Sequence, residues 1–542
     1  MEVDRYMGKK TFLKGAAILG IAGLITQILG AVFRIPLGNI VGDEGMGYYQ
    51  TVYPIYIFLL VFSTNGAPAA ISKMTSEKIA QEDYSGARRI FKLSFIVMFV
   101  IGVIAYLIFT LGAKPIVYML SGQYGAYYAM LAIAPALVLV PLMSVFRGYF
   151  QGMQDMAPTA VSQLTEQTVR VALGLTLAIV FLKKGINFAA AGATLGTSIG
   201  PVAGLLILVF IYKKRKNMLL ELEEKEKNFQ KEPAKNIFKT LIYIAVPITI
   251  GVSILPIMNI ADVTIVMQRM QDAGFSTMEA NALYGQLTGL AGPIINIPMA
   301  LGLSIALSMV PAIASAHMTK DVEFLKENTK LGLRTAMIVG VPCALGLMAI
   351  SRPVMQLLYP LQRESAVNAA PCLFILSIGI IFLSVAQAMA GVLQGISKPS
   401  RAVMALGIGF VVKCMATYIL VGFPELNVKG AAIGTALGYA ACGICNYYFV
   451  KKYTETKFDI QLAVIKPMIS GTVMFVSVFI SEKLLEYIVG ISIATVISIA
   501  IGAIVFFVMI IKTKAVTVDE LRNLPKGEKL VKVMYKIKLV KE

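Results

Sequence analysis

The chain has 542 residues, of which 57% are hydrophobic and 15% are charged, and its formal net charge is +19. Soluble domains carry about a quarter charged residues, so this composition excludes an ordinary soluble protein. Apolar runs of about 20 residues recur along the chain, and each is long enough to cross a hydrocarbon core of ~30 Å. The sequence therefore predicts an all-α polytopic membrane protein.

Fourteen transmembrane helices are predicted in chain order. Their ranges are 12–36, 47–72, 90–112, 125–151, 158–182, 188–212, 237–268, 282–315, 329–350, 367–394, 400–421, 429–450, 462–482 and 489–511. With the N-terminus inside, 37 of the 49 Lys and Arg fall in cytoplasmic segments and eight fall in outer segments. The positive-inside rule thus predicts a cell-membrane protein with both termini in the cytoplasm. The basic excess then reflects topology and attraction to anionic membrane lipids rather than nucleic acid.

An internal repeat runs through the chain. Four short patterns recur in the same order, 238 or 243 residues later; they begin at Pro68 and Pro311, Lys114 and Arg352, Arg147 and Ala390, and Gly192 and Gly430. Six helices separate each pair, so the two halves share one orientation, and transporters built from repeats commonly bind substrate between them. We expect an N-terminal lobe at 1–212, a cytoplasmic linker at 213–236, a C-terminal lobe at 237–455, two extra helices at 456–512 and a basic cytoplasmic tail at 513–542.

Four of the 49 Lys and Arg remain after the cytoplasmic and outer segments are counted. With the carboxylates Glu166 and Asp262 they are candidates for function, because a charge in lipid is costly. Arg170 lies near mid-depth and Glu166 precedes it by four positions, so the two share a helix face. Lys413 follows Gln394 by the interval that separates Arg170 from Gln151. We therefore expect Arg170 and Lys413 to face a central cavity, with Glu166 tuning Arg170.

The other charges allow two explanations each. Arg147, near the inner end of its helix, either lines the cavity or extends to the interface, and the same choice applies to Arg34 beside Pro36. Asp262 aligns with the neighbourhood of Arg34 in the repeat, which suggests an outward gate formed by these two residues. The surplus of positive charge favours an anionic substrate, because arginine matches phosphate geometry.

Covalent chemistry is not expected. One histidine, five cysteines in apolar spans and no phosphate-binding glycine loop supply neither a metal site nor a nucleophile. We therefore expect a transporter without a cofactor, acting as a monomer. Coupling to the membrane potential, to Na⁺ or to H⁺ stays open.

The stretch from Phe12 to Tyr56, the run STNGAPAAISKMTSE that follows and the later YFQGMQDMAP resemble the oligosaccharide flippases of the multidrug/oligosaccharidyl-lipid/polysaccharide (MOP) superfamily. The resemblance is to the group of Gram-positive bacteria that includes stage V sporulation protein B and MurJ-like lipid II flippases. It implies two six-helix bundles with alternating access, an extra helix pair that lines a groove for a lipid tail, and cavity arginines. Arg34 matches the arginine of the first helix, whereas the second helix lacks its arginine.

This resemblance implies a flippase for an undecaprenyl-pyrophosphate-linked saccharide, with lipid II as the expected substrate. Arg34, Arg170, Lys413 and Arg147 would bind the pyrophosphate, while Glu166 and Asp262 would tune or gate. A polysaccharide-repeat exporter, a cation-coupled multidrug antiporter and a membrane scaffold without transport are the alternatives.

Overall fold

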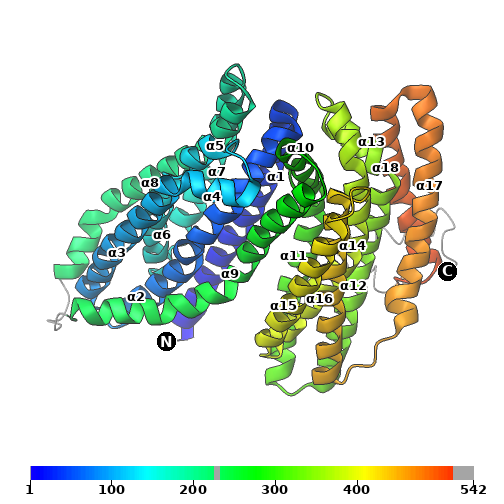
Figure 1. The fold of residues 1–542 in the computed structure, drawn as a ribbon. Coiled ribbons are helices and arrows are strands. Elements are labelled where there is room, and N and C mark those ends of the chain that lie inside the picture. Colours follow the sequence, from blue (N-terminus) through cyan, green and yellow to red (C-terminus); the bar gives the residue numbers. More distant parts are fainter. Residues whose placement is uncertain (1, 225–231, 517–542) are drawn as a thin grey trace. The chain divides into compact units, whose positions relative to one another are not determined.

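The computed structural model describes residues 2–224 and 232–516, and within these ranges the chain is helical apart from short turns, with no β-strand (Figure 1). The long apolar runs form helices because lipid offers no partner for backbone N–H and C=O groups. The predicted all-α membrane fold is confirmed.

The helices follow one another in this order. They are α1 (Glu2–Val61), α2 (Ala67–Ala80), α3 (Tyr84–Leu111), α4 (Ala113–Ser121), α5 (Tyr127–Ile133), α6 (Ala136–Gly152), α7 (Ala157–Leu182), α8 (Ile186–Glu224), α9 (Ala234–Asp272), α10 (Thr277–Tyr284), α11 (Gly292–Met318), α12 (Val322–Ala349), α13 (Ser351–Leu358), α14 (Arg363–Gly395), α15 (Pro399–Val421), α16 (Val428–Thr454), α17 (Lys466–Val489) and α18 (Ile491–Lys512). Short π-helical turns precede α2, α11 and α17, at Phe62–Gly66, Gly285–Ala291 and Gln461–Ile465.

Thirteen stretches of the described chain are long and apolar enough to cross a membrane. The first of them, Ile18–Ala80, covers 63 residues, far more than the ~20 that one crossing needs. Within it, Gly42 has φ 67° and ψ −170°, a backbone conformation open essentially only to glycine. This break lies between the first two predicted spans. The remaining stretches follow the predicted ranges closely, and the number fourteen stays a prediction.

The chain divides into two compact units. Unit 1 comprises Met1–Gln268 and Ser276–Gly285, and unit 2 comprises Arg269–Phe275 and Gln286–Glu542. Most of α9 and all of α10 therefore pack with unit 1, although the repeat assigns them to the second half. The predicted lobes group helices by sequence equivalence, and they stay a prediction.

The core of unit 1 joins residues from α1 to α6 with residues of α8 and α9. Ile237, Leu241 and Ala245 bring the first turns of α9 into this core, which also contains Phe91 and Met98 of α3. An ion pair of 3.2 Å joins Lys78 of α2 to Glu232, just before α9. The beginning of α9 is thus attached to unit 1 by both apolar and ionic contacts.

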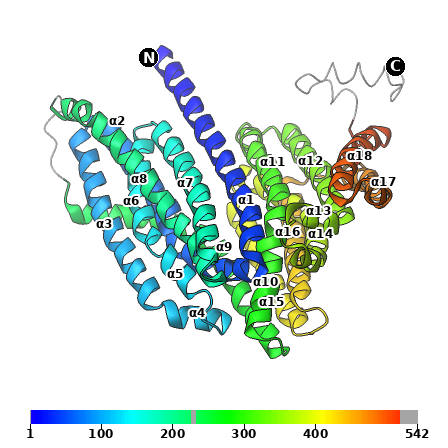
Figure 2. The same cartoon turned by 90° about the horizontal axis from the view of Figure 1, so that it is seen from above.

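In unit 2, α17 and α18 run side by side in both views (Figures 1 and 2). Gly502 of α18 lies against Val478 of α17, since a Cβ at Gly502 would come within 2.6 Å of that side chain. At the end of α18, the buried Arg334 of α12 donates from Nε to the carbonyl oxygen of Ala515 at 2.7 Å. This contact satisfies a carbonyl beyond the helix C-terminus, where backbone acceptors lack helical partners.

Candidate functional site

Arg170 is held by two tyrosines of α1. It lies midway along α7, and its Nη2 donates to the hydroxyl oxygens of Tyr49 at 2.9 Å and Tyr53 at 3.3 Å. Tyr49 and Tyr53 are four residues apart and so share a helix face, with their rings stacked at 5.4 Å. Tyr49 is fully buried. The hydroxyls thus fix the guanidinium in place without neutralising its charge.

A second arginine approaches the same tyrosine. The guanidinium of Arg34 lies 5.7 Å from the centre of the Tyr53 ring, and that of Arg170 lies 5.5 Å from it. Arg170 also lies 5.8 Å from the ring of Phe33. Aromatic faces attract cations, so these rings accommodate both positive charges. We call Arg34, Arg170, Phe33, Tyr49 and Tyr53 the arginine–tyrosine cluster.

No carboxylate of the described residues lies within ion-pair distance of Arg34 or Arg170, and the buried Nε of Arg170 has no hydrogen-bond partner. Both residues lie in helices long and apolar enough to cross a membrane. An unneutralised charge at such a place is costly and marks a functional site by default. The cluster therefore offers a fixed positive potential and an unused N–H donor.

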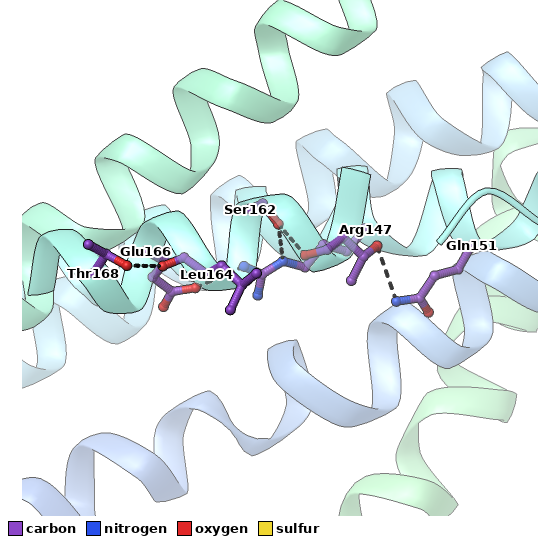
Figure 3. A network of polar contacts seen from close by, with 7 residues as sticks. Arg147, Gln151, Ser162, Leu164, Glu166 and Thr168 are labelled. Atoms are coloured by element: carbon purple, nitrogen blue, oxygen red, sulfur yellow. Dashed lines mark hydrogen bonds and ion pairs between the residues drawn. The ribbon is translucent and has the colours of Figure 1, made fainter. Parts of the chain in front are cut away.

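Arg147 forms a separate ion pair with Glu166 (Figure 3). Its Nη2 lies 2.8 Å from Oε2 of Glu166, its Nε donates to the hydroxyl of Ser162 at 3.0 Å, and the side chains of the pair are 15% and 16% exposed. The structure pairs the Glu166 carboxylate with Arg147 of the neighbouring helix α6. The predicted tuning of Arg170 by Glu166 stays a prediction. Whether Arg147 lines the cavity or extends to the interface stays a prediction.

Glycines bring equivalent helices together at Arg170 and at Lys413. A Cβ at Gly196 would lie 2.8 Å from the carbonyl oxygen of Arg170, and one at Gly200 would lie 3.1 Å from its Cβ. In unit 2, a Cβ at Gly434 would lie 3.2 Å from the carbonyl oxygen of Lys413, and one at Gly438 would lie 2.9 Å from its Cβ. The α7–α8 and α15–α16 pairs thus share one packing geometry around a basic residue.

The predicted gate is not tested by this geometry. Asp262 is buried in α9, at 9% exposure, and belongs to unit 1 together with Arg34. Their pairing stays a prediction, as does the placement of Lys413 and Arg170 on one cavity.

Sequence reasoning missed the aromatic half of the cluster. Tyr49, Tyr53 and Tyr56 recur at intervals of four and three in one apolar span, which places three phenols on one helix face. That pattern was a usable signal, because a tyrosine hydroxyl needs a partner away from water.

Among the residues that the structure describes, no group of three or more His, Cys, Asp or Glu could hold a metal ion. All five cysteines lie in the described part of the chain, and none of them forms a disulfide. An apolar groove of about 360 Å³ lies on α17 and the turn before it, between Val464 and Val473.

Known proteins resemble this chain over most of its length. The family model described as polysaccharide biosynthesis protein matches residues 12–317, and the MatE model matches residues 287–419. In Bacillus subtilis, the uncharacterized membrane protein YabM is 31% identical over 96% of both chains. Stage V sporulation protein B of the same organism is 28% identical over 96% of this chain and 98% of its own.

Lipid II flippase MurJ of Bacillus subtilis is 29% identical over 88% of this chain and 89% of its own. A solved structure of lipid II flippase MurJ in an inward closed conformation superposes with a TM-score of 0.68 at 15% identity, covering 91% of this chain and 98% of the other. At that identity the superposition establishes the fold.

Proposed function

The chain belongs to the polysaccharide biosynthesis protein family of the MOP superfamily, and from this membership we propose that it moves an undecaprenyl-pyrophosphate-linked saccharide across the membrane. It is a multi-pass membrane flippase and not an enzyme. The substrate that we propose is lipid II, carried from the inner to the outer leaflet by alternating access.

The observation that supports this proposal most is the arginine–tyrosine cluster. Arg34 and Arg170 present two guanidinium groups in a region apolar enough to span a membrane, and no carboxylate of the described part of the chain pairs with them. Guanidinium forks bind phosphate oxygens in a bidentate manner and remain charged at any physiological pH. A pyrophosphate would supply the missing negative charge and would accept a hydrogen bond from the unpartnered Nε of Arg170.

The residue roles follow from the contacts. Arg34 and Arg170 would bind the pyrophosphate, and Tyr49 and Tyr53 would hold Arg170 in position. Lys413 would contribute a third cation during the transport cycle. Arg147 would serve the structure of the N-terminal helices instead, because Glu166 already neutralises its charge.

The electrical direction of transport agrees with export. With both termini in the cytoplasm, outward movement of a negative headgroup would release ~2.3 kcal/mol per charge for each 100 mV of inside-negative potential. We propose that this potential drives or assists transport in a cell membrane, and coupling to Na⁺ or H⁺ would add to it.

The apolar groove on α17 would receive the substrate's hydrocarbon tail. Its lining from Val464 to Val473 is apolar apart from Thr472. Each methylene of the tail that is removed from water there would contribute about 0.8 kcal/mol to the free energy of binding. This role agrees with the extra helix pair that the family resemblance implies.

The alternative functions differ in the charged side chains that they would require at the site. A polysaccharide-repeat exporter would use the same cations with another saccharide. A cation-coupled multidrug antiporter would need bare carboxylates, but Glu166 is paired with Arg147, and the MatE model matches only residues 287–419.

The test is complementation of bacteria depleted of their lipid II flippase, with outer-leaflet lipid II as the measured quantity. The wild-type chain should restore it, whereas Arg34→Gln and Arg170→Gln should not. Lys183→Gln is the matched control, since it removes one exposed cation from the end of α7, the helix that carries Arg170.

Failure of the wild-type chain at normal expression would refute lipid II as the substrate. Restoration by Arg34→Gln and Arg170→Gln as complete as by Lys183→Gln would refute the role of the cluster.

A further inference from the structure

A second groove lies between α3 and the first turns of α9, within unit 1. Its volume is about 310 Å³, at the lower end of ligand pockets. Val97 of α3 and Ile237 and Phe238 of α9 contribute apolar walls. Phe238 is 49% exposed, and the neighbouring Ile96 is 59% exposed, so the groove opens beside a hydrocarbon-compatible surface.

Ser94 is a buried polar residue in this groove. Its side chain is 1% exposed, and its hydroxyl has no hydrogen-bond partner. A buried hydroxyl without a partner carries a desolvation penalty. Many helical serines bond to their own backbone, and the absence of such a bond leaves Ser94 free to donate to a ligand oxygen.

The charged residues that we consider beside the groove are lysines. Lys235 lines it and is exposed, and Lys92 and Lys239 are exposed within one helical turn of its lining residues. The predicted topology places this end of α3 and α9 at the cytoplasmic surface. Anionic lipids of the inner leaflet are attracted to basic residues at that depth.

We propose that the α3–α9 groove binds an anionic phospholipid of the inner leaflet. One acyl chain lies along Val97 and Phe238, the phosphate contacts Lys235, and an ester carbonyl oxygen accepts a hydrogen bond from Ser94. The site is distinct from the arginine–tyrosine cluster, which is built on α1 and α7. Because α9 continues from unit 1 into unit 2, the bound lipid stabilises the helix that connects them.

Photo-crosslinking tests this site directly. The full-length protein is placed in phosphatidylcholine nanodiscs with a photoactivatable phosphatidylglycerol, and labelled peptides are measured by mass spectrometry. Labels should concentrate on α3 and α9 around Val97 and Phe238. Lys235→Gln should lower labelling about fivefold, the effect of one basic residue at an anionic surface.

The matched control is Lys239→Gln, which removes the same charge from α9 outside the groove and should lower labelling less than Lys235→Gln does. Val97→Trp should abolish labelling by filling the groove, while circular dichroism shows that the helices persist. Equal effects of Lys235→Gln and Lys239→Gln would overturn the proposal, as would equal labelling by a photoactivatable diacylglycerol. Stronger competition by undecaprenyl pyrophosphate than by phosphatidylglycerol would assign the groove to that lipid and would also overturn it.

Discussion

Exchange of Arg147 and Glu166 for glutamine, singly and together, distinguishes a structural ion pair from a substrate-binding arginine. The two side chains meet at 2.8 Å and are only 15% and 16% exposed. Each single exchange leaves one charge in place without its partner. The double exchange removes both charges and leaves two amides that can hydrogen-bond.

The expected magnitudes follow from this burial. Removing one partner of a buried pair costs about 3–5 kcal/mol; the residual exposure and the Ser162 bond at 3.0 Å bring the estimate to about 2–4 kcal/mol. The double variant should lose about 1 kcal/mol, the value of one net hydrogen bond. The coupling free energy should therefore be several kcal/mol.

Unfolding of the four proteins in detergent, combined as a double-mutant cycle, measures this coupling. Complementation measures transport by the same variants. A coupling near zero would show that the pair does not form. A double variant that is stable but fails to transport would show that Arg147 contacts substrate, which would refute our assignment.

Three further changes test other parts of the structure. Gly196→Ala should destabilise the protein by about 1–3 kcal/mol through overpacking, because the new Cβ would lie 2.5 Å from the Cα of Gly174. Gly407→Ala is the control and should not destabilise it, because no atom lies within 4 Å of the new Cβ. Unfolding of both variants in detergent measures the difference. Arg334→Gln should make the chain at Ala515 more accessible to protease, because the bonds to Ala515 are lost, and unchanged cleavage at Ala515 would contradict a structural role for these bonds. Asp83→Ala should cost about 1–2 kcal/mol by removing the cap of α3, measured as a lower unfolding midpoint; an unchanged midpoint would argue against the cap.

Helix positions could be predicted because the length of an apolar run and the charges that flank it are local properties of the sequence. The repeat could also be predicted, since Gly196 and Gly434 recur at a fixed interval, and both allow a neighbouring helix to approach closely at a basic residue. The break at Gly42 was recognised only as a boundary between spans. Its unusual dihedrals depend on the fold around it and leave no mark in the sequence beyond the glycine itself.

The partners of the charged residues could not be predicted. Spacing along α7 suggested a contact between Glu166 and Arg170, but helix packing brings α6 close enough for Arg147 to take the carboxylate. Tyr49 and Tyr53 then satisfy Arg170 from α1. Such choices depend on which helices are neighbours, and a single sequence does not contain that information in local form.

The assignment of α9 to unit 1 has a consequence for how the chain can be divided. A nick between Glu224 and Glu232 separates the sequence near the repeat boundary, yet it leaves Ile237, Leu241 and Ala245 buried in the core of the preceding fragment. The Lys78–Glu232 ion pair reinforces this hold. Two separately synthesised halves should therefore reassemble by exchange of a helix, much as domain-swapped partners do, and a tag on one should recover the other.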